Sequence, residues 1–145
     1  MAHRYRFDLK MFSTVSLAGA NVSEARRKVE AAFDAVKIEV LVGGNKLDSS
    51  GSRDGSADLL ETDRESKAGK VQVRSVFDLM YFGTLEIEAK SADDARSLIR
   101  QARLTAIVEI DGNRRRFDTS VDDDLVLLEV DGVDYEDDVS VAPVM

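Results

Sequence analysis

The chain has 145 residues and a mass of 16.0 kDa, enough for one ordinary domain or two very small ones. Its 28 acidic and 20 basic residues give a net charge of −8, and the absence of Cys excludes a disulfide scaffold, a cysteine-based zinc site and a thiol nucleophile. No apolar stretch approaches the roughly 18–20 residues of a membrane span and no secretory signal opens the chain, so we expect a cytoplasmic protein.

The first elements predicted along the chain are a strand, a helix and three further strands. Apolar and polar residues alternate from Tyr5 to Leu17, which is typical of a half-buried strand. Asn21 and Glu24 then occupy the cap and third positions of a helix whose apolar spacing runs to Phe33. A strand over residues 36–42, a turn at 43–45, a weaker strand over 46–50 and a strand over 57–62 complete a β-α-β-β-β order.

The second half of the chain is predicted to repeat this order. Apolar alternation from Val71 to Ala89 predicts another long strand. Ser91 and Asp94 indicate the start of a helix that runs to Ala102. Further strands are predicted over residues 106–110, 115–121 and 125–130, with a turn at 111–113.

The two halves are related by a shift of 70 residues, which aligns residues 7–40 with residues 77–110 without a gap. Nine of the 34 aligned positions are identical, whereas chance gives roughly two at ordinary amino-acid usage. The identical pairs are Phe7/Phe77, Asp8/Asp78, Leu9/Leu79, Phe12/Phe82, Thr14/Thr84, Ala25/Ala95, Arg26/Arg96, Ala32/Ala102 and Glu39/Glu109. Ser13 and Gly83 interrupt the apolar alternation at matching places, which predicts a bulge, a bend or a hairpin there.

The fold class predicted from these elements is α+β. We expect a tandem duplication of the β-α-β-β-β unit, with mostly antiparallel sheets, one helix per unit and the helices covering one face. The first unit covers residues 1–63, a connector covers 64–70, and the second unit, with an acidic C-terminal extension, covers 71–145. Pseudo-twofold packing into one compact domain is preferred to two independent units, because each unit alone is near the lower size limit for a stable core.

The charge of the chain is unevenly distributed. All 20 basic residues lie in residues 1–116, whereas residues 117–145 contain ten acidic residues and no basic one. Carboxylates at alternate positions of a strand lie about 6.6 Å apart, which resembles the regular spacing of negative charges along a nucleic-acid backbone. The candidate partner-binding residues are Asp122, Asp123, Asp124, Asp131, Asp134, Glu136, Asp137 and Asp138. The alternative interpretation of residues 134–138 is a solvated tail.

Few residues are available for catalysis or for metal binding. His3 is the only His and lies near the N-terminus, so the usual zinc clusters and nucleophilic triads cannot be assembled. The glycine-containing segment 43–46 lacks the spacing of a phosphate-binding loop. The acidic residues between 118 and 131 do not match the ligand spacing of an EF-hand. We therefore predict no enzymatic activity, no cofactor and no metal site.

Two basic clusters, Arg26-Arg27-Lys28 and Arg114-Arg115-Arg116, offer contacts for phosphate groups. The net charge of −8 opposes association with DNA or RNA at long range. The same clusters can also pair with the acidic end of the chain itself. We therefore do not predict direct binding of nucleic acid.

The leading functional hypothesis is a non-enzymatic, acidic module that binds a protein partner with a basic surface. Its most concrete form is an inhibitor of the kind encoded by phages and mobile elements, which occupies a basic surface of a nucleic-acid-handling complex by nucleic-acid mimicry, as in an anti-CRISPR-like mode of action. One alternative is a small structural or assembly protein that forms homodimers or larger oligomers through sheet edges. Another is a carboxylate-based protein that binds a divalent cation.

Overall fold

The computed structural model describes residues 2–67 and 69–135, of which 65% lie in strands and 16% in helices. All strand pairings in this part of the chain are antiparallel. The elements in chain order are β1 (His3–Gly19), α1 (Val22–Ala32), β2 (Val36–Val42), β3 (Asn45–Arg53), β4 (Asp58–Lys67), β5 (Lys70–Ala89), α2 (Ala92–Gln101), β6 (Arg103–Ile110), β7 (Asn113–Val121), β8 (Val126–Val130) and β9 (Val133–Asp134).

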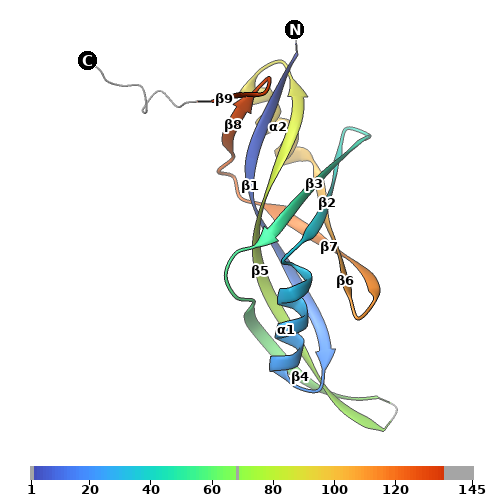
Figure 1. Ribbon diagram of the computed structural model, residues 1–145. Coiled ribbons are helices and arrows are strands. Elements are labelled where there is room, and N and C mark those ends of the chain that lie inside the picture. The colour runs from blue at the N-terminus through green and yellow to red at the C-terminus, as the bar shows by residue number, and fades with distance from the viewer. Residues whose placement is uncertain (1, 68, 136–145) are drawn as a thin grey trace, which may run out of the picture.

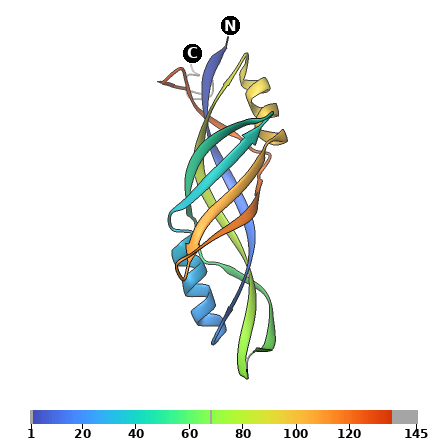
Figure 2. The same cartoon turned by 90° about the vertical axis from the view of Figure 1, so that its right-hand side faces the viewer.

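Six of the strands form a closed β-barrel. β1 pairs with β5, and the ring continues from β5 through β3, β2, β6 and β7 back to β1. β4 pairs with the same edge of β5 as β3 does, farther along the strand. In the same way, β8 pairs with the same edge of β1 as β7 does. The views in Figures 1 and 2 show one helix toward each end of the barrel. The α+β prediction, with helices covering one face of a sheet, is therefore wrong: the protein is mostly β and closes into a barrel.

The barrel closes because strands of one repeat pair with strands of the other. In the β1–β5 pair Met11 lies opposite Tyr81, and in the β2–β6 pair Lys37 lies opposite Ile107. The two residues in each of these pairs are 70 positions apart in the chain. Alternation in the sequence determines which face of a strand is buried but not which strand lies beside it. Of the residues expected as a connector, 64–67 and 70 lie in the paired strands β4 and β5.

Residues that are identical in the two repeats make the same contacts at the two helices. The guanidinium of Arg26 in α1 lies over the ring of Phe77, 5.7 Å from its centre, and Nε donates a hydrogen bond to the main chain just before β4. Arg96 in α2 lies over the ring of Phe7 at 5.4 Å and donates to the main chain just before β8. Both phenylalanines are fully buried. Each arginine therefore connects a helix of its own repeat to the first strand of the other repeat.

Ser13 and Gly83 do not interrupt their strands, because β1 and β5 pair continuously through both residues. The buried hydroxyl of Ser13 lies 2.6 Å from the hydroxyl oxygen of Tyr81. Gly83 lies opposite Gly51 of β3, where a Cβ added to Gly51 would come 2.7 Å from the carbonyl oxygen of Phe82. The predicted bulge is wrong. Ser13 makes a buried polar contact in β1, and Gly83 allows the backbones of β5 and β3 to approach closely.

Candidate functional site

The predicted acidic residues lie in two separate places, one before β8 and one after it. Asp122–Asp124 form the connection between β7 and β8, whereas Asp131 lies in the β8–β9 turn and Asp134 in β9. The main chain of the first group is hydrogen bonded to Lys10 of β1, and that of the second group to Arg4. These two anchor points are about 20 Å apart along the strand, so the two groups do not form one cluster. The candidate residues Glu136, Asp137 and Asp138 lie outside the described residues.

The main chain of the acidic loop, as we call Asp122–Asp124, is held at several points. The N–H of Asp122 donates to the Lys10 carbonyl at 2.9 Å, and the Asp122 carboxylate accepts from the N–H of Asp124 at 3.0 Å. Arg100 of α2 donates to the Asp123 carbonyl at 3.1 Å. The loop bends at Asp123 and is not part of a strand, so the spacing expected for an extended strand does not apply to it. Asp123 and Asp124 are exposed, and their carboxylates form no hydrogen bond or ion pair with any other described residue.

Asp131 connects the β8–β9 turn to the beginning of β1. Its φ of 53° lies in the left-handed region, and its carboxylate accepts a hydrogen bond from the N–H of Arg4 at 2.8 Å. Nδ1 of His3 lies 2.6 Å from the other carboxylate oxygen. The hydrogen bond from Arg4, followed by that from His3, lowers the pKa of the Asp131 carboxyl below its ordinary value. The carboxylate of Asp131 is therefore already engaged within the protein.

Replacing Asp131 with asparagine is expected to reduce stability near neutral pH. A carboxyl whose pKa is lowered by folding stabilises the protein above its unfolded pKa of about 3.9 and loses this contribution as the pH falls through the folded value. Asparagine tolerates the left-handed backbone but carries no charge. The difference in urea midpoint between the wild type and Asp131→Asn should therefore shrink as the pH falls below about 4. Asp134→Asn, which changes an exposed carboxylate of β9, is the control, and a pH-independent difference for Asp131→Asn would contradict this role.

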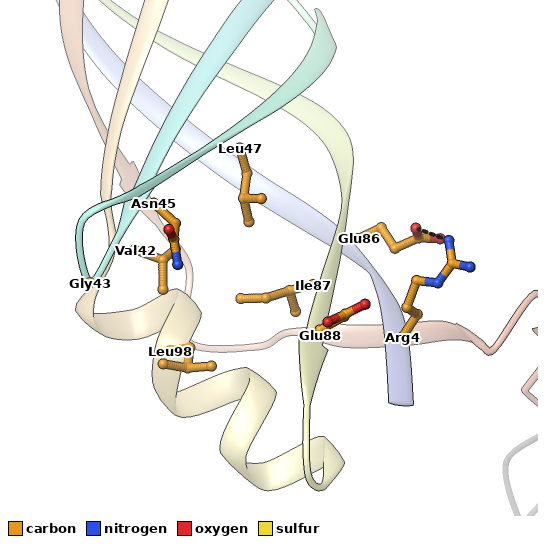
Figure 3. A pocket seen from close by; sticks show the side chains of 9 residues that line it. All are labelled: Arg4, Val42, Gly43, Asn45, Leu47, Glu86, Ile87, Glu88 and Leu98. Carbon is orange, nitrogen blue, oxygen red and sulfur yellow. Dashed lines mark hydrogen bonds and ion pairs between the residues drawn. The ribbon is translucent and has the colours of Figure 1, made fainter. Parts of the chain in front are cut away.

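A hollow of about 520 Å³ opens beside α2 at one end of the barrel (Figure 3). Its size is within the range of small-ligand sites. The buried Ile87 and the partly buried Val42, Leu47 and Leu98 form its apolar side. The residues along its polar side are Asn45, Arg4, Glu86 and Glu88. None of the eight was among the predicted site residues.

In α1, at the other end of the barrel, the residue that matches Leu98 of α2 is Lys28. Its ammonium lies 3.0 Å from Asp111 and 3.3 Å from Glu24, and hydrogen bonds to these two carboxylates raise the pKa of Lys28. The contact with Asp111 ties α1 to the β6–β7 turn. A shift of 70 residues places Leu98 where Lys28 stands and Leu41 where Asp111 stands. The charged pair Lys28–Asp111 is thus replaced by two leucines at the matching positions. This difference between the repeats is the signal in the sequence that could have drawn attention to the hollow.

Four of the six side chains in the two basic clusters contact the protein itself. Arg26 and Lys28 make the contacts described above. Arg115 lies 5.5 Å from the centre of the Phe117 ring, and Arg116 pairs with a glutamate of β2 at 3.4 Å. These contacts give most of the basic residues in the clusters a role within the fold.

Within residues 2–67 and 69–135, no three His, Asp or Glu side chains lie close enough together to hold a metal ion. No helix in the same part of the chain has the length and apolar character needed to cross a membrane. No protein-family model, curated protein or solved structure matches the chain. The candidate sites are therefore the acidic loop and the hollow beside α2.

Proposed function

We propose that this chain is a cytoplasmic, non-enzymatic binding module whose acidic loop contacts a basic surface on a partner protein. The observation that carries the proposal is a loop whose main chain is anchored to β1 and α2 while the carboxylates of Asp123 and Asp124 stay exposed. A loop that is already ordered loses less conformational entropy on binding than a mobile one. Exposed carboxylates on such a loop can speed association with a basic surface and select for it.

The matched test compares two double variants with the same change in net charge. Asp123→Asn/Asp124→Asn removes the two free carboxylates of the acidic loop, and Asp54→Asn/Asp58→Asn removes two exposed carboxylates in and before β4. Partner proteins retained from a cell extract by each immobilised variant are measured by quantitative mass spectrometry and then by titration of the purified partner. The loop variant should bind the partner about tenfold more weakly, equivalent to about 1.4 kcal/mol, whereas the β4 variant should bind as the wild type does. Equal affinity of the wild type and the loop variant would contradict the proposal.

The most concrete form of the proposal is inhibition of a nucleic-acid-handling complex, of the kind that phages and mobile elements encode. In that case the acidic loop occupies the partner's phosphate-binding surface. Duplex DNA or RNA added to the preformed complex should then release this protein in proportion to the nucleic acid's own affinity for the partner. If the complex persists at saturating nucleic acid, nucleic-acid mimicry is contradicted. The broader proposal, that the acidic loop contacts a basic surface, is not affected by that result.

A second candidate function, assembly through sheet edges, is favoured by β4. This strand pairs only with β5 in the described part of the sheet, and Leu59 and Leu60 on it are 40% and 57% exposed. An exposed edge with apolar side chains can pair with another chain. Sedimentation equilibrium distinguishes the candidates, because assembly requires a mass above 16.0 kDa that rises with protein concentration.

A further inference from the structure

The outer face of the β1–β5 pair has an approximate twofold axis. The two strands lie side by side over the whole of β1 (Figure 1), and Met11 lies opposite Tyr81, the residue at the same position of the second repeat. A half-turn about this pair therefore brings each residue of β1 onto its equivalent in β5. Since Met11 and Tyr81 are buried and alternate residues point to opposite faces, the even-numbered residues of both strands lie on the outside of the barrel.

This outer face is more alike in the two repeats than the buried face. Of the eight outer positions of β1 from residue 4 to residue 18, four carry the same residue in β5: Arg4/Arg74, Asp8/Asp78, Phe12/Phe82 and Thr14/Thr84. Of the nine inner positions from residue 3 to residue 19, two do: Phe7/Phe77 and Leu9/Leu79. Substitutions at solvent-facing positions usually change stability little. Folding alone therefore does not explain why the outer positions are the more similar ones.

Contacts within the fold account for one of the four outer pairs. The guanidinium groups of Arg4 and Arg74 contact equivalent residues of the opposite strand. Asp8 and Asp78, in contrast, are partly buried and make no hydrogen bond or ion pair with any other residue in the described ranges. Burial raises the pKa of the Asp8 carboxyl above its ordinary value, and aspartate is disfavoured within strands. Both repeats thus carry a carboxylate that the fold does not use.

An apolar patch lies between the two carboxylates. Phe12 and Phe82 are partly buried and are diagonal neighbours across the two strands, and Met80 lies opposite Phe12. Asp8 is six residues from the position opposite Asp78, so the two carboxylates are about 20 Å apart along the strands. The face therefore presents an apolar centre with one free carboxylate at each end.

The same face is recessed at two equivalent places. Hollows of about 510 and 540 Å³ lie beside Thr14 and Thr84, respectively, and Phe12 and Asp78 also line the first of them. Recesses beside an apolar patch can accept the side chains of a protein partner.

We infer that this face binds a homodimeric protein whose own twofold axis coincides with that of the β1–β5 pair. Each subunit of the partner places a Lys or Arg side chain against Asp8 or Asp78, and apolar side chains of both subunits cover Phe12 and Phe82. A homodimer presents the same group twice across its axis, which matches a face that carries the same residues twice. Hydrogen bonds between cationic groups and carboxylates are stronger than those between neutral groups.

A second copy of this chain does not fit the face as well. It would bring the same two carboxylates against this surface, and its net charge of −8 opposes self-association. The inference goes beyond the proposed function, since it requires neither Asp123 nor Asp124.

The face is tested first with 1,12-diaminododecane, a symmetric dication with an apolar centre. The control is 1,6-diaminohexane, which carries the same charge on a shorter chain. NMR signals of Phe12, Met80 and Phe82 are followed during titration at constant ionic strength. The longer diamine should shift them saturably, with a Kd on the order of 1 mM, as expected for a ligand of this size. The shorter diamine cannot reach both carboxylates and should bind at least about threefold more weakly.

Single variants test whether the two ends of the face are equivalent. Asp8→Asn and Asp78→Asn should each weaken binding of the longer diamine about threefold, because each removes one partly exposed ion pair. Asp63→Asn, which changes an exposed carboxylate of β4, is the control and should leave binding unchanged. Asp123→Asn/Asp124→Asn should also leave it unchanged. Failure of the acidic loop to bind a partner and failure of this face to bind the diamine are therefore distinguishable.

Cross-linking tests the symmetry of the protein partner. The chain has no Cys, so Thr14→Cys and Thr84→Cys each allow a single benzophenone label to be attached to this face through a maleimide. After illumination in a cell extract, mass spectrometry should find the same peptide of one partner protein attached at both positions. The purified partner should sediment as a dimer.

The inference is overturned if neither diamine shifts these signals, if the two diamines bind equally well, or if only one of Asp8→Asn and Asp78→Asn weakens binding. It is also overturned if the two labels capture different peptides, a peptide of this chain, or no protein.

Discussion

Gly83→Ala is expected to lower the free energy of unfolding by about 3 kcal/mol or more. Overpacking a core typically costs about 1–3 kcal/mol, and here the added methyl meets main chain that cannot rotate away. A Cβ on Gly83 would lie inside contact distance of the carbonyl oxygen of Ser50 in β3 and 3.0 Å from Cε of Met11. Since β3 meets β5 only over residues 50–53, this change acts at the seam where the barrel closes.

Urea unfolding measures this loss, and amide hydrogen exchange locates it. Protection should fall first in β3, while the β1–β5 pairing keeps its protection. Gly19→Ala is the matched control, because a Cβ at Gly19 meets its nearest atoms at an ordinary 3.6 Å. The control should change stability by less than about 1 kcal/mol. A similar small effect for Gly83→Ala would show that β3 and β5 do not approach as closely as described.

Phe7→Ala and Phe77→Ala are each expected to cost about 3–5 kcal/mol, the range for truncating a fully buried aromatic side chain. Each ring is fully buried and also lies beneath an arginine that connects a helix to the barrel. The cation–π contact adds about 0.5–1 kcal/mol at a partly exposed site. Losing either ring therefore removes core packing and, at the same time, the contact between the ring and the arginine of the nearby helix.

The controls for these variants are Phe12→Ala and Phe82→Ala, which change another phenylalanine pair that is identical in the two repeats. Phe12 and Phe82 are only partly buried, so their truncation should cost less than half as much. Urea denaturation of the four variants, with m values checked for constancy, gives the comparison. A cost below about 1.5 kcal/mol for Phe7→Ala or Phe77→Ala would contradict the packing described for the rings.

Local features of the fold were predictable from the sequence, whereas its closure was not. Both helix starts are confirmed: the side chain of Asn21 accepts a hydrogen bond from the N–H of Glu24 at 2.8 Å, and that of Ser91 accepts from Asp94 at 3.1 Å. These caps depend on residues three positions apart. The pairing of β2 with β6 joins residues 62 to 70 positions apart, and nothing in either strand specifies that neighbour. The barrel was missed for this reason.

The candidate sites were predictable to different extents. Charge counting located the acidic loop, but it could not reveal that Asp131 is held by His3 and Arg4, because these residues are 128 and 127 positions away in the chain. The hollow beside α2 was missed because its apolar residues look like ordinary core positions and its polar residues look like ordinary surface positions. Only a comparison of the repeats distinguishes them, through Leu98 in place of Lys28.

The crossed pairing of the repeats has a consequence for the way the chain folds. Each long strand pairs mainly with a strand about 70 residues away in the chain. The entropy cost of closing this large loop must therefore be met before the pairing contributes favourable free energy. Topologies dominated by such distant contacts fold slowly, in milliseconds to seconds for small domains. Neither repeat can complete its backbone hydrogen bonds while the other is unfolded. We therefore expect a single slow, all-or-none folding transition in which the barrel forms only after the end of β7 has been synthesised.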